Sequence, residues 1–285
     1  AATAASGATP ASGAVAATQA ASGAAVVAAS APAGIAAAPA GQNIAVKTDI
    51  YNLTFNTTGG SLVGAELLQF KEQGKSGQYF KLLDDSEHLK YMVQSGLTGG
   101  DYPNHLTPMT LVSTERALTA GKDELQVRFE SPVLGGIKLV KTYTLKRGSY
   151  AIGVSHEVIN TNAAAVNVQL YEQLVRDDSK SPGTHQFYSS YTGPAFYSSE
   201  GKYQKVKFTD IANGKASFQQ EAKDGYVAMV QRYFATAWLP QAGTPRENYV
   251  RVQDGLYAAG ELFNLGQVAP GASTSNASTL FVGPQ

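Results

Sequence analysis

The sequence predicts an all-β protein built as two packed antiparallel sheets, with short helical pieces at most. Three observations lead to this prediction. Apolar and polar residues alternate with a period of two in several segments. The chain carries 15 Tyr, 11 Phe and 29 Gly, which suits short strands joined by tight turns. No period of 20 to 50 residues repeats, which disfavours a propeller or a solenoid.

The first strand is predicted around residues 51–55, where Tyr51, Leu53 and Phe55 share one face. Gly59 and Gly60 then end it, and the apolar segment 61–70 completes a hairpin. Residues 71–108 are rich in Gly, Ser and Asp, with brief apolar pieces at 79–83 and 91–93. We expect short strands joined by long loops there.

The middle of the chain predicts a meander of antiparallel strands. Residues 125–129, 137–145, 150–159 and 166–170 each alternate, and turn residues such as Gly135, Gly136 and Gly148 separate them. Because each connection is short, neighbouring segments are expected to pair with each other.

The densest apolar stretch is residues 225–240, and its flanking Gly225 and Pro240 favour a buried strand. We expect this stretch to be central to the core, through the following residues: Tyr226, Val227, Met229, Val230, Tyr233, Phe234, Trp238 and Leu239. The pair Asp254 and Gly255 then predicts a two-residue hairpin turn, and residues 279–282 predict a closing strand.

Residues 1–43 form a leader of Ala, Gly, Ser and Pro, and the first charged side chain of the chain is Lys47. Such a segment buries too little apolar surface to offset its ordering entropy. We therefore expect 1–43 to be a disordered tether and 44–285 to be one β-sandwich domain.

Composition excludes several classes of function. Lys plus Arg and Asp plus Glu are each 22, so no basic field attracts a nucleic acid backbone. There is no Cys, which removes disulfides and thiol chemistry. No run of apolar residues approaches the roughly 18 to 20 that span a bilayer.

A search for catalytic or metal-binding patterns predicts no such site and no cofactor. The four histidines lack the spacing of paired metal ligands, and His156 shares its strand parity with apolar residues, which places it on the inward face. Its neighbour Glu157 points to the opposite face. The paired acids Asp84 and Asp85, and likewise 177 and 178, also diverge in an extended chain, and loop solubility explains them.

The segment 185–208 interleaves aromatic residues with Ser, Gly and Lys. Such a segment can form a rim that binds a peptide or a sugar; alternatively, its aromatic residues anchor a long loop to the edge of the sandwich. The candidate partner-binding residues are Phe187, Tyr188, Tyr191, Phe196, Tyr197 and Tyr203.

Several stretches together resemble the periplasmic domain of the YidC membrane protein insertase family of Gram-negative bacteria. The strongest is GYVAMVQRYFATAWLP at residues 225–240. The others, in matching order over about residues 44–285, are 46–49 running into 56–60, 94–99, 141–148, 193–198 and 280–284.

This resemblance implies a twisted super-sandwich similar to galactose mutarotase, inserted between a first transmembrane helix and a five-helix insertase core. It implies a non-catalytic domain at the periplasmic face of the inner membrane. The domain would support the insertion and folding of membrane proteins by contacting SecD, SecF or nascent membrane proteins. Insertion itself would be carried out by the five-helix insertase core.

A carbohydrate-binding or mutarotase-like protein that uses the aromatic segment 187–208 is the alternative. The two hypotheses differ in one structural feature. Acidic side chains clustered beside a histidine in an open cleft would favour the alternative, because anomerisation needs a placed acid and base.

Overall fold

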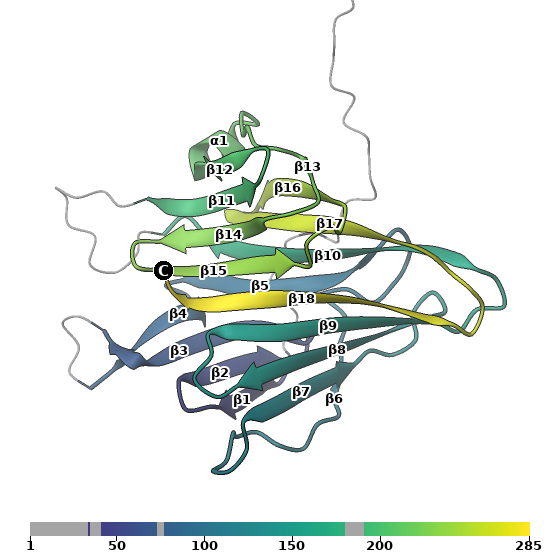
Figure 1. Ribbon diagram of the computed structural model, residues 1–285, viewed down its shortest axis with the longest axis horizontal. Coiled ribbons are helices and arrows are strands. Elements are labelled where there is room, and N and C mark those ends of the chain that lie inside the picture. The colour runs from purple at the N-terminus through teal and green to yellow at the C-terminus, as the bar shows by residue number, and fades with distance from the viewer. Residues whose placement is uncertain (1–33, 35–40, 73–76, 180–190) are drawn as a thin grey trace, which may run out of the picture.

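The computed structural model describes residues 34, 41–72, 77–179 and 191–285. Within them the chain forms eighteen strands and one short helix, arranged as two nine-stranded sheets that pack face to face (Figure 1). The predicted all-β sandwich is confirmed. Strand β1 begins at Asn43, and most of the range for which we expected a tether lies outside the described residues.

Sheet 1 has the order β1-β2-β3-β4-β5-β10-β17-β16-β13. Its strands are β1 (Asn43–Lys47), β2 (Tyr51–Asn56), β3 (Ser61–Lys71), β4 (Tyr79–Asp85), β5 (Lys90–Thr98), β10 (Val166–Asp177), β17 (Leu256–Val268), β16 (Arg246–Gln253) and β13 (Glu221–Ala222).

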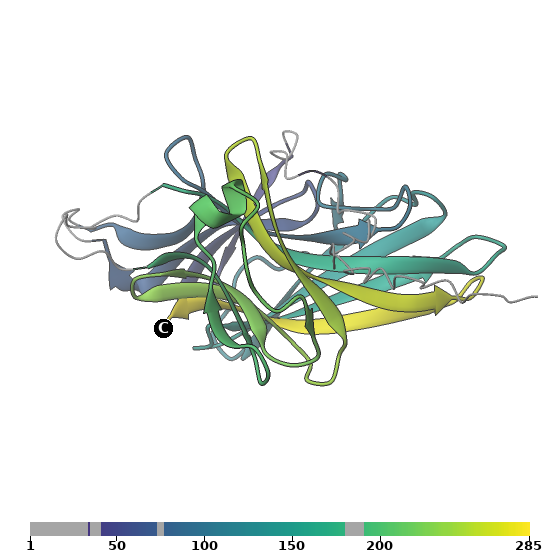
Figure 2. The ribbon, with the colours of Figure 1, turned by 90° about the horizontal axis from the view of Figure 1, so that it is seen from above.

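Sheet 2 has the order β12-β11-β14-β15-β18-β9-β8-β7-β6. Its strands are β12 (Lys202–Lys205), β11 (Thr192–Ser198), β14 (Tyr226–Gln231), β15 (Phe234–Pro240), β18 (Ser273–Pro284), β9 (Ala151–Asn160), β8 (Ile137–Lys146), β7 (Glu124–Glu130) and β6 (Thr110–Leu111). Figure 2 shows how strongly both sheets twist.

Alternating residues build the core between the sheets. Tyr51, Leu53 and Phe55 of β2 are each at most 1% exposed, as predicted. The Phe55 ring lies 4.8 Å from the Tyr143 ring of β8 and 5.9 Å from the Phe129 ring of β7, measured between centroids. These aromatic contacts join sheet 1 to sheet 2.

The stretch 225–240 is a hairpin of two strands, β14 and β15, so the prediction of one buried strand was wrong. The turn lies at Arg232 and Tyr233, and Arg232 has a φ of 44°. Tyr233 is 61% exposed and Leu239 is 36% exposed, so neither belongs to the core. Trp238 is fully buried. The turn was missed because it contains no Gly, Pro or Asn.

Strands β5 and β18 are longer than predicted. β5 continues through Gln94, Ser95 and Gly96, and all but its first residue are buried. The first half of β18 is rich in Ser and Thr and pairs with β9, from Ser273 opposite Ile159 onward. The alternation of apolar and polar residues did not predict the full length of either strand, because polar residues occupy several of the positions that pair in the sheets. The Asp254–Gly255 turn is confirmed, with φ values of 52° and 77°.

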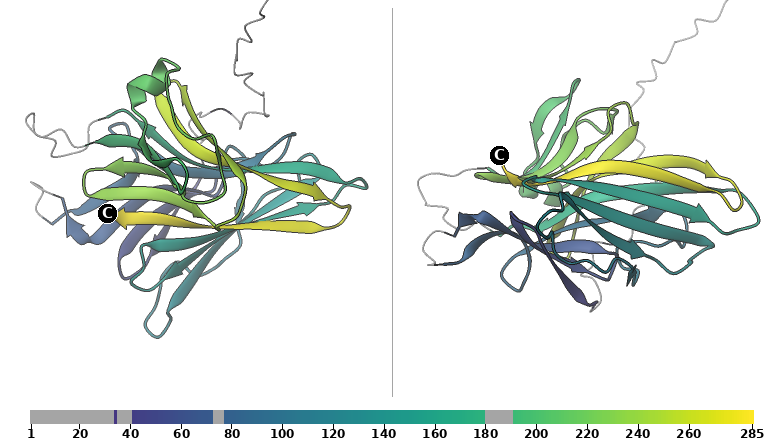
Figure 3. Two further views of the ribbon diagram at one scale, coloured as in Figure 1. Left: turned by 45° about the horizontal axis from the view of Figure 1, so that its top comes forward. Right: turned by 60° about the horizontal axis from the view of Figure 1, so that its bottom comes forward.

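Helix α1 (Phe208–Ala212) has five residues and lies beside β12 at one end of the sandwich (Figures 1 and 3). No helix in the described ranges has the length and apolar character needed to cross a bilayer. The site described below lies close to this end.

Replacing Trp238 with Ala should lower the free energy of unfolding by about 3 to 5 kcal/mol, because the ring is fully buried between the sheets. The measurement is urea denaturation followed by circular dichroism. Tyr233→Ala is the matched control, since that ring is mostly in solvent. Equal midpoints for Trp238→Ala and the unmodified chain would contradict the assignment of Trp238 to the core.

Candidate functional site

Three tyrosines form a row on the outer face of sheet 2. Tyr197 of β11 lies directly opposite Tyr203 of β12 and directly opposite Tyr226 of β14, so the three side chains share one face. The rings of Tyr197 and Tyr226 are stacked, with centroids 5.5 Å apart. Tyr197 is 38% exposed and Tyr203 is 45% exposed.

Small residues support this row. Ala195 of β11 and Ala228 of β14 lie opposite each other on the same outer face, and both are buried beneath partly exposed aromatic rings. Because side chains alternate along a strand, Phe196, between Ala195 and Tyr197, points to the inner face of the sheet. Phe196 is 1% exposed, stacks on Phe218 with centroids 4.6 Å apart, and belongs to the core.

Lys205 and Tyr191 complete the surface. The Lys205 Nζ atom lies 5.0 Å from the Tyr191 ring centroid and 5.8 Å from the Tyr203 ring centroid. The Tyr191 hydroxyl donates to the Val206 carbonyl oxygen at 2.8 Å, which fixes the start of β11 against the segment after β12. We name the set Tyr191, Tyr197, Tyr203, Lys205 and Tyr226 the tyrosine surface.

The structure does not bring the six candidate residues from the sequence together in one site. Tyr197 and Tyr203 lie on the surface, Tyr191 is half-buried at its border, and Phe196 points into the core. Residues 187 and 188 lie outside the described residues. Tyr226, which we expected in the core, is a half-buried member of the surface, because β14 turns it outward.

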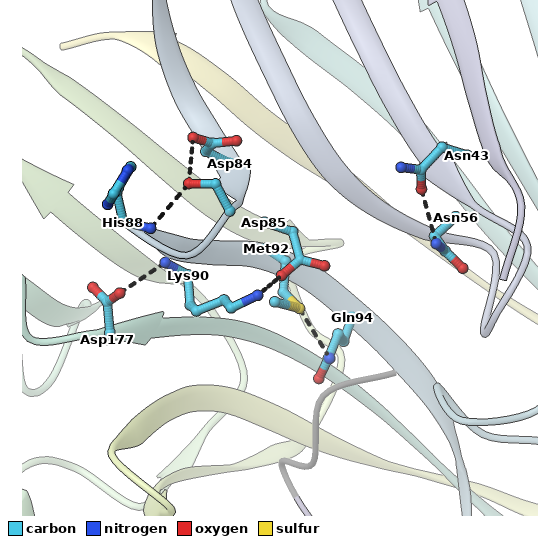
Figure 4. Close-up of polar contacts among 10 residues, drawn as sticks. Asn43, Asn56, Asp84, Asp85, His88, Lys90, Met92, Gln94 and Asp177 are labelled. Atoms are coloured by element: carbon cyan, nitrogen blue, oxygen red, sulfur yellow. Dashed lines mark hydrogen bonds and ion pairs between the residues drawn. The ribbon is translucent and has the colours of Figure 1, made fainter. Parts of the chain in front are cut away.

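The paired acids stabilise a turn rather than gather in a cleft (Figure 4). Asp85 forms an ion pair with Lys90 at 2.6 Å, and an Asp177 carboxylate oxygen accepts the backbone N–H of Lys90 at 2.7 Å. Asp84 accepts a hydrogen bond from the Ser86 hydroxyl at 3.0 Å. These contacts hold the β4–β5 turn against the end of β10.

A buried acid and imidazole pair joins the sheets, and sequence reasoning missed it. The Glu172 Oε1 atom of β10 lies 3.4 Å from the His156 Nδ1 atom of β9, and neither side chain is exposed. The Ser95 Oγ atom lies 2.8 Å from His156 Nε2. Lys141 donates to the carbonyl oxygens of Gly59 and Ser95 at 2.6 and 2.7 Å. His156 faces inward as predicted, but its partner is 16 residues away in sequence and on the other sheet.

A second acid extends this buried cluster. Glu261 of β17 lies directly opposite Glu172, and Arg246 donates to it from Nε at 2.6 Å. Burial, and then the charge of Glu261, raise the pKa of Glu172 to about 8. Burial raises the pKa of Glu261 to about 8 against the opposing effect of Arg246, and burial lowers the pKa of Lys141 to about 7.

This cluster is enclosed between the sheets, and neither the His156 nor the Glu172 side chain is exposed to solvent. Burial lowers the pKa of His156 well below its usual value, which keeps the ring neutral. A neutral imidazole beside a carboxyl group of raised pKa can share one proton without a net buried charge. Among the described residues, no three His, Asp or Glu side chains gather as metal ligands would.

Comparison with known families decides the relationship. Residues 43–285 match the family described as the YidC periplasmic domain. The chain belongs to the YidC periplasmic domain family.

Relatives named membrane protein insertase YidC support this assignment. The chain is 45% identical over 247 residues to the YidC of Bordetella avium, which covers 86% of this chain and 44% of that protein. It is 47% identical to the YidC of Bordetella petrii, with 86% and 44% covered. It therefore spans less than half the length of these YidC proteins.

Solved structures support the fold. A galactose mutarotase-like protein from Clostridium acetobutylicum has a TM-score of 0.53 at 8% identity, and covers 86% of this YidC domain and 96% of that chain. A protein from Synechocystis sp. PCC 6803 has a TM-score of 0.52 at 9% identity, with 88% and 99% covered. The predicted mutarotase-like super-sandwich is confirmed, and this likeness extends to the fold alone.

The buried acids make the stability of this YidC domain depend on pH. A pKa of Glu172 raised to about 8 means that its stabilising contribution is complete below about pH 4.5 and is lost as the pH rises through 8. Glu172→Gln should therefore gain stability relative to the unmodified domain by up to about 1.4 kcal/mol per pH unit between pH 5 and 7. Above pH 7 the lowered pKa of Lys141 has the opposite effect, because it makes the domain more stable as the pH rises.

Urea unfolding at several pH values measures this difference. Glu157→Gln is the matched control, because Glu157 adjoins His156 in sequence on the outward face of β9. A difference between Glu172→Gln and the unmodified domain that is constant from pH 5 to 7 would contradict the assignment.

Proposed function

We propose that this domain supports the insertion and folding of inner-membrane proteins from the periplasmic face of the membrane, without catalysing a reaction. In this proposal it contacts SecD, SecF or translocating membrane proteins through the tyrosine surface. The observation that carries the proposal is the row of Tyr203, Tyr197 and Tyr226 on the outer face of a YidC-family sandwich.

The chemistry of the tyrosine surface suits protein binding. Tyrosine is enriched at protein interfaces, because its ring buries a large area at a low entropy cost and its hydroxyl forms hydrogen bonds. The surface contains three stacked or adjacent rings, and Lys205 lies over two of its tyrosine rings. Tyr191 and Tyr226 rest on buried small residues, so those rings are held in place before a partner binds.

The surface also lies at an edge of the sandwich. β12 is the terminal strand of sheet 2 in the described chain and has only four residues. A partner that reaches this edge meets the tyrosine rings first. A domain tethered to a membrane meets its neighbours at a high effective concentration, so a small contact area is sufficient.

The alternative was a carbohydrate-binding or mutarotase-like function. The feature that would favour it is an acid beside a histidine in an open cleft. His156 does lie beside Glu172, but both side chains are fully buried, so a sugar has no access to them. This enclosure supports the proposal of a binding domain.

Photo-crosslinking tests the binding proposal. A photoreactive residue in place of Tyr197 or Tyr203, in the full-length insertase in membranes, should crosslink to SecD, SecF or a translocating chain. A probe in place of Val112 is the control, since Val112 is 42% exposed and lies next to β6, at the opposite edge of sheet 2. Crosslinks of equal yield at all three positions would contradict the role of the tyrosine surface.

Polarimetry tests the proposed absence of catalysis. The domain should not accelerate the mutarotation of galactose or glucose above the buffer rate, because its acid and imidazole pair is enclosed. Acceleration that is lost in Glu172→Gln would contradict this proposal and restore the mutarotase hypothesis.

A further inference from the structure

The outer face of sheet 1 carries a row of paired positions, two glutamines, a glycine and a tyrosine, that none of the functions above uses. Gln94 of β5 lies directly opposite Gln173 of β10, and Gln173 lies opposite Gly260 of β17. Gly260 in turn lies opposite Tyr249 of β16. Because residues in register share a face, the row crosses four adjacent strands.

Hydrogen bonds fix the orientation of this row. The Gln173 Nε2 group donates to Gln94 Oε1 at 2.8 Å. Gln173 Oε1 accepts from the Tyr249 hydroxyl at 2.8 Å and from an Arg251 guanidinium N–H at 3.3 Å. Gln94 and Gln173 are at most 2% exposed, so this polar network is part of a defined structure rather than a solvated surface.

Two glycines allow tyrosine rings to lie across the strands. A Cβ atom at Gly260 would lie 2.6 Å from the Tyr249 hydroxyl, and one at Gly96 would lie 2.6 Å from the Tyr171 hydroxyl. Any larger residue would displace these rings. The positions of the Tyr171 and Tyr249 rings on this face therefore require glycine at 96 and 260.

His105 borders the row and is held as a hydrogen-bond donor. The Tyr171 hydroxyl accepts the backbone N–H of His105 at 3.1 Å and lies 2.5 Å from His105 Nδ1. Burial lowers the pKa of His105 to about 4, so the ring is neutral. The Tyr171 hydroxyl proton is then directed to Nδ1, which leaves the ring proton on Nε2.

The His105 Nε2–H group donates to the main-chain carbonyl oxygen of Gly34 at 2.9 Å. Gly34 belongs to the charge-free leader, 71 positions before His105. Gly34 also lies against the Gln253 amide of β16, where a Cβ atom would come within 2.8 Å of Gln253 Oε1. The His105 Nε2–H group is thus hydrogen-bonded to a peptide carbonyl oxygen, and the residue that supplies this carbonyl has no side chain.

We propose that this face of sheet 1 is a binding site for the main chain of an uncharged peptide rich in small residues. Gly34 of the same chain is its resident occupant. His105 is the donor to the peptide carbonyl, and Tyr171 is the positioning residue that fixes the tautomer of His105. The proposal is independent of the tyrosine surface, which lies on the other sheet.

The chemistry of the leader matches the face. The leader carries no charged side chain before Lys47, and the groups that contact Gly34 are a neutral imidazole and a primary amide. The charged group on the same side of β16, Arg251, donates to Gln173. The tether between Gly34 and the first residue of β1, Asn43, is short, which gives the leader a high effective concentration at the site. A weak contact is therefore sufficient in cis, and a similar segment of another protein can displace the leader.

The test uses a fluorescent peptide with the sequence of residues 30–42 and anisotropy as the readout. A chain that starts at Gly41 keeps all the described strands and should bind this peptide, and its melting temperature verifies that it is folded. The intact chain should bind the peptide at least about tenfold more weakly, because its own leader competes. His105→Ala should reduce binding by at least about tenfold, whereas His88→Ala, at an exposed histidine in the β4–β5 turn, should not change it.

A second readout keeps the intact chain. His105→Ala should increase the rate at which elastase cleaves the leader by at least about fivefold, since the docking contact at Gly34 is removed. Two results would overturn the proposal. One is peptide binding that is absent at millimolar concentration or is unchanged by His105→Ala. The other is displacement of the peptide by millimolar galactose, which would make this face a saccharide site.

Discussion

Strand β10 is the constraint on which the rest of the structure depends. It lies inside sheet 1, between β5 and β17, and both of its faces are covered. Glu172 points inward to His156 of the opposite sheet, whereas its neighbour Gln173 points outward to Gln94 and Tyr249. A shift of one residue would exchange these two polar networks and leave buried groups unpaired. The register of β10 therefore fixes the inner core and the outer polar face together.

How far the sequence predicts this fold depends on how many faces of a strand are buried. The strands predicted at 51–55, 125–129, 137–145 and 150–159 bury mainly one face, so alternation identified them and most of their inward residues. β5 and β10 bury both faces and include polar residues, so alternation underestimated their lengths. The turn at Arg232 and Tyr233 was missed for another reason. Its backbone conformation is imposed by pairing of β14 with β15 and not by turn-forming residues.

The candidate site shows the same limit. Composition located the aromatic segment, but only register shows that Tyr197 and Tyr203 point outward while Phe196 points inward. The contact of His156 with Glu172 joins different sheets. The contact of His105 with Tyr171 joins a loop to a strand 66 residues away. No spacing rule places such pairs together, because each depends on how two distant strands are packed.

Hydrogen exchange of the backbone amides tests the central role of β10 most directly. If β10 is enclosed on both faces and paired on both edges, its amides exchange only when the whole domain unfolds. The free energy of opening measured for Tyr171, Glu172 and Gln173 should then equal the global free energy of unfolding from urea denaturation. The amides of the edge strand β12 should exchange with a much lower free energy of opening. Exchange of the β10 amides through local openings as easily as those of β12 would contradict this account.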